Sequence, residues 1–147
     1  MTIWFDMDGT TADLYSVEGW LDFLRNDSTI PYERAKPMLN FSRFARYLNL
    51  LQKKGYTIGI ISWGSKFASD EYLARIRAEK FFWLMKHLPS VSWDYIKVEH
   101  YGTNKWEVCG EGILFDDEIK NRDSWQGKAY SPETIFDILM NLNRKEV

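Results

Sequence analysis

Short apolar runs alternate with segments of helical period along this chain. The runs have strand length, occur at residues 2–6, 56–62, 95–99 and 113–116, and end in small or acidic residues. Strands that alternate with helices form parallel sheets joined by right-handed crossovers. The pattern therefore predicts an α/β fold, a Rossmann-like parallel sheet with helices on both faces, which binds ligands at the carboxyl ends of its strands.

Three segments show the helical period most clearly. Residues 42–54 end before Gly55, which suits the left-handed position after a helix, and residues 69–88 end before Pro89. A third segment, residues 131–142, begins with serine and proline, which suit an N-cap and a first turn. The residues expected on the inward faces of the first two helices are Phe44, Tyr47, Leu48 and Leu51, and Leu73, Ile76, Phe81 or Phe82, Leu84 and Leu88.

Residues 13–40 break this alternation. They contain two prolines, a polar stretch at residues 26–29 and one short helical pattern at residues 17–24. We interpret this segment as a small insertion above the first strand. No internal repeat or linker divides the rest, and 147 residues suit a single domain, 1–147.

Composition and charge exclude several classes of function. The 19 basic and 21 acidic residues give a net charge of −2, which disfavours nucleic-acid binding driven by charge. No window has the ~18 uncharged apolar residues of a membrane span, and the first residues do not resemble a signal peptide. The single cysteine, Cys109, cannot form an internal disulfide. We therefore expect a cytoplasmic protein that does not bind membranes.

Acidic residues gather where the predicted strands end. If the strands are parallel, Asp6 and Asp8, Ser62, and Asp116 with Asp117 meet at one edge of the sheet. Four carboxylates this close raise one another's pKa values unless a cation neutralises them, and an all-oxygen site suits Mg²⁺. The expected metal ligands are therefore Asp6, Asp8, Asp116 and Asp117.

Gly9 follows Asp8 and allows a tight turn whose backbone N–H groups can hold a phosphate. A calcium loop is the competing interpretation of these residues. It fails because that motif needs glycine at its sixth position and glutamate at its twelfth, where this chain has Thr11 and Val17.

The motifs resemble those of the haloacid dehalogenase-like phosphohydrolases. Their first motif, two aspartates one residue apart followed by Gly-Thr after an apolar strand, matches IWFDMDGT. The second is similar to Ser62 at the end of YTIGIIS, the third to Lys105, and the fourth to LFDDE. Lys97 is a rival for the third motif. The order of the motifs agrees over nearly the whole chain.

Within that superfamily the chain resembles most the 5'(3')-deoxyribonucleotidases. These share the continuation DGxxAD, here residues 8–13, an aromatic helix similar to residues 80–88, and a lysine shortly before two aspartates, as in NKWEVCGEGILFDD. The insertion at residues 13–40 is shorter than their helical cap. The resemblance therefore implies a phosphohydrolase core with a small, reduced cap.

This resemblance implies a reaction and roles for the residues. Asp6 is the expected nucleophile, which forms an aspartyl-phosphate, and Asp8 the expected acid and base. Ser62 and Lys105 are expected to bind the phosphate. Of the last two aspartates, one ligates Mg²⁺ directly and the other acts through water or orients the lysine; we favour Asp117 as the direct ligand.

The expected substrate is a small phosphomonoester, a nucleoside monophosphate. Leu14 stands where the family has a base-stacking phenylalanine, so Trp20, Phe23 or Trp63 is the candidate for stacking on the base. Two alternatives stay open. One is an open-site phosphatase for a bulkier phosphate, such as the end of a nucleic acid, and the other is a non-catalytic phosphate-binding protein.

Overall fold

The computed structural model describes residues 1–145, and within them five strands form one parallel sheet in the order β5-β4-β1-β6-β7. The strands are β1 (Thr2–Phe5), β4 (Thr57–Trp63), β5 (Tyr95–Glu99), β6 (Ile113–Phe115) and β7 (Ala129–Tyr130). β1 lies at the centre and pairs with β4 on one side and β6 on the other. The carboxyl ends of strands that are distant in sequence therefore meet at one edge.

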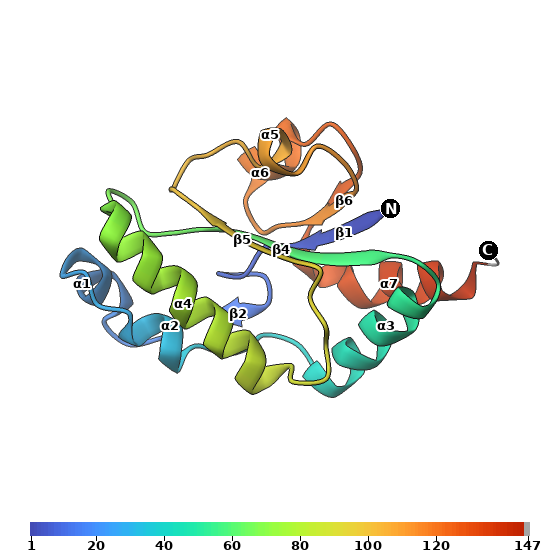
Figure 1. The fold of residues 1–147 in the computed structure, drawn as a ribbon, viewed down its shortest axis with the longest axis horizontal. Helices are drawn as coiled ribbons and strands as arrows, with labels where there is room; N and C mark the ends of the chain where they lie inside the picture. Colours follow the sequence, from blue (N-terminus) through green and yellow to red (C-terminus); the bar gives the residue numbers. More distant parts are fainter. Residues whose placement is uncertain (146–147) are drawn as a thin grey trace.

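Helices cover both faces of the sheet (Figure 1). One face carries α3 (Phe41–Lys53), α4 (Asp70–His87) and α7 (Ile135–Arg144), the last preceded by the 3-10 turn η1 (Pro132–Thr134). The other face carries the short helices α5 (Lys105–Cys109) and α6 (Ile119–Ser124). The predicted α/β class and parallel sheet are confirmed. None of the helices within residues 1–145 is long and apolar enough to cross a membrane.

Alternate strand residues enter two apolar cores, because successive side chains of a strand point to opposite faces. Ile3 and Phe5 of β1 belong to the larger core, where the Phe5 ring meets the ring of Phe44 of α3 edge to face, 5.0 Å between centroids. Trp4, between them, belongs to a smaller core with Trp125 under α5 and α6. Both faces of β1 are thus buried, which fixes where β1 ends and its acidic loop begins.

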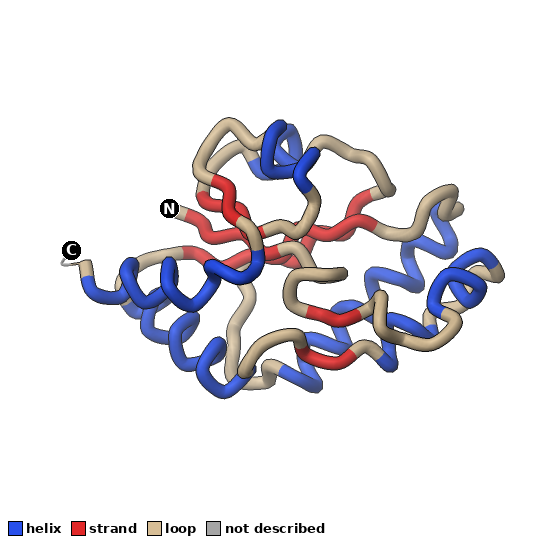
Figure 2. The backbone as a smooth tube through the Cα atoms, turned by 180° about the vertical axis from the view of Figure 1, so that it is seen from behind, coloured by secondary structure: helices blue, strands red, loops and turns tan. Residues whose placement is uncertain are grey.

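Residues 13–40 fold beside the sheet rather than within it. Their elements are α1 (Trp20–Arg25), α2 (Ile30–Arg34) and β3 (Lys36–Pro37), the last pairing antiparallel with β2 (Ala12–Asp13) in a separate two-stranded ribbon (Figure 2). This segment packs on the beginning of α4: the Tyr72 hydroxyl donates to the carbonyl of Ser28 at 2.6 Å, and Arg75 donates to that of Asp27 at 2.9 Å. It forms one wall of the cavity described below.

One prediction about α4 is wrong. Phe81 or Phe82 was expected to face inward, but the two residues are 44% and 62% exposed. The buried positions next to them are Lys80 and Trp83, which follow Ile76 at helical spacing. The inward stripe of α4 therefore includes a lysine, and the two phenylalanines lie at its solvent side.

Candidate functional site

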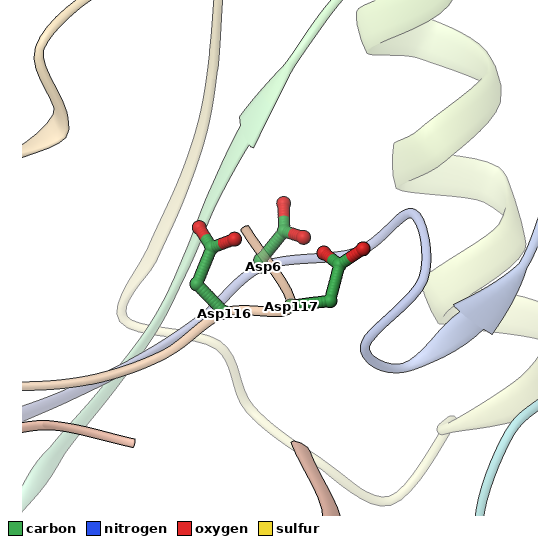
Figure 3. A group of neighbouring side chains, drawn as sticks. All are labelled: Asp6, Asp116 and Asp117. Atoms are coloured by element: carbon green, nitrogen blue, oxygen red, sulfur yellow. The ribbon is translucent and has the colours of Figure 1, made fainter. Parts of the chain in front are cut away.

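Three carboxylates converge at the carboxyl ends of β1 and β6 (Figure 3). Asp6 directly follows β1, and Asp116 and Asp117 directly follow β6. The backbone N–H of Asp6 donates to the carbonyl of Phe115 at 2.9 Å and holds the two strand ends together. One carboxylate oxygen from each aspartate lies within 4.8 Å of the others. The parallel pairing of β1 with β6 thus creates a compact acidic cluster.

Lys105, the first residue of α5, balances part of this charge. Its Nζ donates to Asp6 Oδ1 at 3.0 Å and to Asp116 Oδ2 at 2.6 Å, and the residue is only 2% exposed. Asn104 begins the helix here, because its side chain accepts a hydrogen bond from the Glu107 backbone N–H. Burial alone would lower the pKa of Lys105, but the charges of Asp6 and Asp116 outweigh it and hold that pKa above its usual value.

Asp116 is engaged entirely by the protein. Besides Lys105, its Oδ2 accepts a hydrogen bond from Asn121 Nδ2 at 3.1 Å, and its Oδ1 accepts one from the Glu118 backbone N–H at 2.9 Å. The residue is fully buried. Asp116 therefore orients Lys105, and Asp117, which is only half-buried and lines the adjoining cavity, is the freer carboxylate.

Thr10 and Gly9 set the distance between Asp6 and Asp117. The Thr10 hydroxyl lies 3.1 Å from Asp6 Oδ2 and 3.3 Å from Asp117 Oδ1, and it accepts a hydrogen bond from the Asp117 backbone N–H at 3.1 Å. Gly9 has φ 82°, and a Cβ there would overlap the Asp117 carboxylate. Glycine is therefore required both by the left-handed backbone and by the close approach of Asp117.

A second buried lysine, Lys80, holds Asp8. Its Nζ donates to Asp8 Oδ2 at 3.0 Å, to Ser62 Oγ at 2.6 Å and to the carbonyl of Trp63 at 2.8 Å, and the residue is 1% exposed. These three acceptors match the three protons of an ammonium group. Sequence reasoning missed Lys80, although a lysine in the same helical stripe as Ile76 and Trp83 is the signal that could have identified it.

The donor set fits a divalent cation such as Mg²⁺. Asp6 and Asp117 offer carboxylate oxygens, and Mg²⁺ is typically bound through one or two carboxylates, with water and phosphate oxygens completing its octahedron. Asp6, Asp8, Asp116 and Asp117 carry four negative charges, and Lys80 and Lys105 carry two positive ones. The remaining charge of −2 matches one divalent cation.

Crowding and burial perturb three of these carboxyl groups. Burial and the charge of Asp6 raise the pKa of Asp116 to about 6. Burial raises the pKa of Asp117 above its usual value, and a hydrogen bond and the charge of Asp6 raise it further. Burial also raises the pKa of Asp8, which the ion pair with Lys80 opposes. Without a metal cation, the raised pKa values favour proton binding by these carboxyl groups, which reduces the negative charge at this edge of the sheet.

The other residues singled out in the sequence lie in different surroundings. The Ser62 hydroxyl is buried and binds Lys80 instead of facing the cavity. Trp63 lines the cavity, and its ring lies 5.3 Å from Lys105 Nζ. Lys97, the rival of Lys105, lies away from the cluster: its Nζ contacts the carbonyl of Val108 at 3.3 Å and the ring of Trp4.

A cavity of about 550 Å³ opens directly above the carboxylates. Asp6, Asp8, Asp117 and Lys105 line it at the strand ends. Of the three aromatic residues proposed for stacking, Trp20 and Trp63 line the cavity, whereas Phe23 is not among its lining residues. The volume is within the ~300–1,000 Å³ of small-molecule sites, so the acidic cluster is accessible to a ligand of nucleotide size.

We predict that Lys80→Met lowers the free energy of unfolding by about 3 kcal/mol, because it leaves the Asp8 carboxylate without its buried partner. Urea denaturation of Lys80→Met, Asp8→Asn and the double variant measures this. The double variant should be more stable than the sum of the single losses predicts, since Asp8→Asn removes the unpaired charge. Lys97→Met is the matched control. Strict additivity would contradict the ion-pair account.

We also predict that Mg²⁺ stabilises the protein more as pH rises. The raised pKa of Asp117 means that the metal-free native state loses stability as pH rises through that pKa, and Mg²⁺ competes with the bound proton. Thermal unfolding should show a larger rise of Tm with Mg²⁺ at about pH 8 than at about pH 6. Asp117→Asn should abolish the rise, and Asp123→Asn, on the exposed side of α6, should retain it. An equal rise at both pH values would refute the prediction.

No protein-family model matches this chain, and no curated protein matches it either.

Proposed function

We propose that the protein is a Mg²⁺-dependent phosphomonoesterase that acts through an aspartyl-phosphate on Asp6. One observation carries this proposal: the carboxylates of Asp6, Asp8 and Asp117 line a single cavity together with Lys105. A nucleophile, an acid and base, a metal ligand and a buried cation are the groups that phosphoryl transfer needs. Mg²⁺ would supply positive charge to the Asp6 carboxylate and to the phosphate oxygens.

In the first step, a carboxylate oxygen of Asp6 forms a bond to phosphorus while the bond from phosphorus to the leaving oxygen breaks. Asp8 in its protonated form gives its proton to that oxygen, so an alcohol leaves. Within residues 1–145, Asp8 Oδ2 is occupied by Lys80, whereas Oδ1 makes no hydrogen bond and is free to carry the proton. The raised pKa of Asp8 favours the protonated form that this step requires.

In the second step, a water oxygen attacks phosphorus and the bond to Asp6 breaks. Asp8, now a carboxylate, takes the proton from water, and inorganic phosphate leaves with Asp6 restored. Lys105 stays charged throughout, because its contacts with Asp6 and Asp116 raise its pKa. It stabilises the negative charge that spreads over the phosphoryl oxygens in both transition states.

The motifs and the fold support membership of the haloacid dehalogenase-like phosphohydrolases. Their four motifs resemble residues 3–10, Ser62, Lys105 and residues 114–118 of this chain. The parallel sheet accounts for their spacing, since β1, β4 and β6 are neighbours and their carboxyl ends meet. We propose a nucleoside monophosphate as substrate, because the cavity joins the acidic cluster to the aromatic side chains of Trp20 and Trp63.

We predict that Asp6→Asn abolishes hydrolysis and leaves the fold intact, because the amide keeps the shape and removes the nucleophilic oxygen. Phosphate release from thymidine 5'-monophosphate and from an aryl phosphate, with Mg²⁺ and with a chelator, measures this. The wild-type protein should be active only with Mg²⁺. Retention of substantial turnover by Asp6→Asn, with deamidation excluded by mass, would argue against the covalent mechanism. Failure of the wild-type protein on all phosphomonoesters would favour a phosphate-binding protein.

We predict that Asp8→Asn affects the two steps of the reaction differently, because formation of the aspartyl-phosphate needs an acid only for a poor leaving group, whereas its hydrolysis always needs a base. An aryl phosphate has a good leaving group, so attack by Asp6 continues, but the aspartyl-phosphate lacks its base and accumulates. Loss of acid–base assistance typically costs ~10²–10⁴ in rate, so an alkyl phosphate should hardly react. Mass spectrometry of the quenched enzyme detects the intermediate. Equal losses for both substrates without a trapped phosphoenzyme would instead give Asp8 a structural role.

A further inference from the structure

Two cations on the cavity wall lie outside the charge balance of the acidic cluster. Arg25 is the last residue of α1, and Lys66 lies in the turn between β4 and α4. Both line the cavity and both are exposed. Neither forms an ion pair with a carboxylate anywhere in residues 1–145. Figure 1 shows α1 and the β4–α4 turn at the same end of the molecule, remote from the termini.

These cations are not needed for the phosphoryl group that would be transferred. Lys80 is paired with Asp8 and Lys105 with Asp6 and Asp116, and a divalent cation would balance the remaining charge. All four acidic side chains that line the cavity, Asp6, Asp8, Asp117 and Glu118, belong to the loops after β1 and β6. Arg25 and Lys66 come from other elements, the end of α1 and the turn after β4.

Aromatic side chains line the same cavity. The ring centroids of Trp63 and Tyr101 lie 4.9 Å apart, and those of Trp20 and Tyr15 lie 5.0 Å apart. Phe67, next to Lys66, is 94% exposed and has φ 63°, an unfavourable backbone for a bulky residue. Exposed aromatic rings beside cations are typical of sites that stack on bases and bind the phosphates joining them.

We propose that the preferred substrate carries a second phosphate on its leaving group, which Arg25 and Lys66 bind. This inference rests on the proposed phosphomonoesterase activity and defines its substrate class more narrowly. The second group is a phosphate ester of a nucleoside, either in a nucleoside 3',5'-bisphosphate or in the first phosphodiester of a 5'-phosphorylated oligonucleotide. Arginine and lysine both bind phosphate oxygens with charged hydrogen bonds.

The test compares three substrates that share the same base: thymidine 5'-monophosphate, thymidine 3',5'-bisphosphate and the 5'-phosphorylated thymidine dinucleotide. Release of 5'-phosphate with Mg²⁺ gives kcat/KM for each. The same three ligands are titrated calorimetrically into Asp6→Asn, so that affinity is measured without turnover. The variant is Arg25→Gln/Lys66→Gln. Its matched control, Lys86→Gln/Arg144→Gln, removes the same charge from exposed positions outside the cavity.

We expect kcat/KM and affinity to be about tenfold higher for at least one substrate with a second phosphate than for the monophosphate. Arg25→Gln/Lys66→Gln should lose most of this preference, and the control variant should keep it. A stronger gain with the bisphosphate than with the dinucleotide would identify a small metabolite, and the reverse a nucleic-acid end.

Three results would overturn the inference. They are no preference in the wild-type protein, a preference that survives in Arg25→Gln/Lys66→Gln, and equal losses for all three substrates. Each of these leaves the phosphomonoesterase proposal standing, provided that the monophosphate is hydrolysed. Absence of Mg²⁺-dependent phosphate release from every substrate would instead refute the proposed function. The affinities of the three ligands for Asp6→Asn would then test separately whether a second phosphate is bound.

Discussion

The ammonium group of Lys105 bridges two buried carboxylates, and the arrangement of the site depends on this interaction. The parallel pairing of β1 with β6 brings Asp6 and Asp116 together where both are buried, and like charges so close are unfavourable without a cation. Lys105 reaches both carboxylates from the first position of α5. This contact binds Asp116 so fully that Asp117 becomes the carboxylate that faces the cavity.

Lys80 neutralises the carboxylate of Asp8 in the same way, from the opposite face of the sheet. It comes from α4, which packs on the face away from α5, and its ammonium group reaches Asp8, Ser62 and the end of β4. Lys80 pairs with Asp8, and Lys105 pairs with Asp6 and Asp116, so the described residues give Asp117 no lysine partner and the remaining charge suits one divalent cation. Asp6 and Asp8 thus have different partners, which is consistent with the different roles that we propose for them, nucleophile for Asp6 and acid and base for Asp8.

Much of the fold could be predicted because buried parallel strands are continuous apolar runs and their ends carry the acidic residues. The four predicted strands, and the helices at residues 42–54 and 69–88, agree with the structure within one residue at each end. Short elements such as α5 and β7 have too few residues to show a period. Lys80 was missed because a lysine normally indicates a solvent-exposed position. One of Phe81 and Phe82 was placed inward because a phenylalanine normally indicates a buried position. Which aspartate binds Lys105 depends on side-chain distances, which no spacing in the sequence contains.

A crystal structure with Mg²⁺ and orthovanadate, an analogue of the pentacovalent phosphoryl transition state, tests the central claim most directly. The account predicts Mg²⁺ between the carboxylates of Asp6 and Asp117, vanadium facing an oxygen of Asp6, and Asp116 still bound to Lys105. It also predicts that Asp8 Oδ1 points to the oxygen that stands for the leaving group. Vanadate and Mg²⁺ bound away from Asp6, or neither bound at saturating concentration, would contradict the claim that this cluster is a phosphoryl-transfer site.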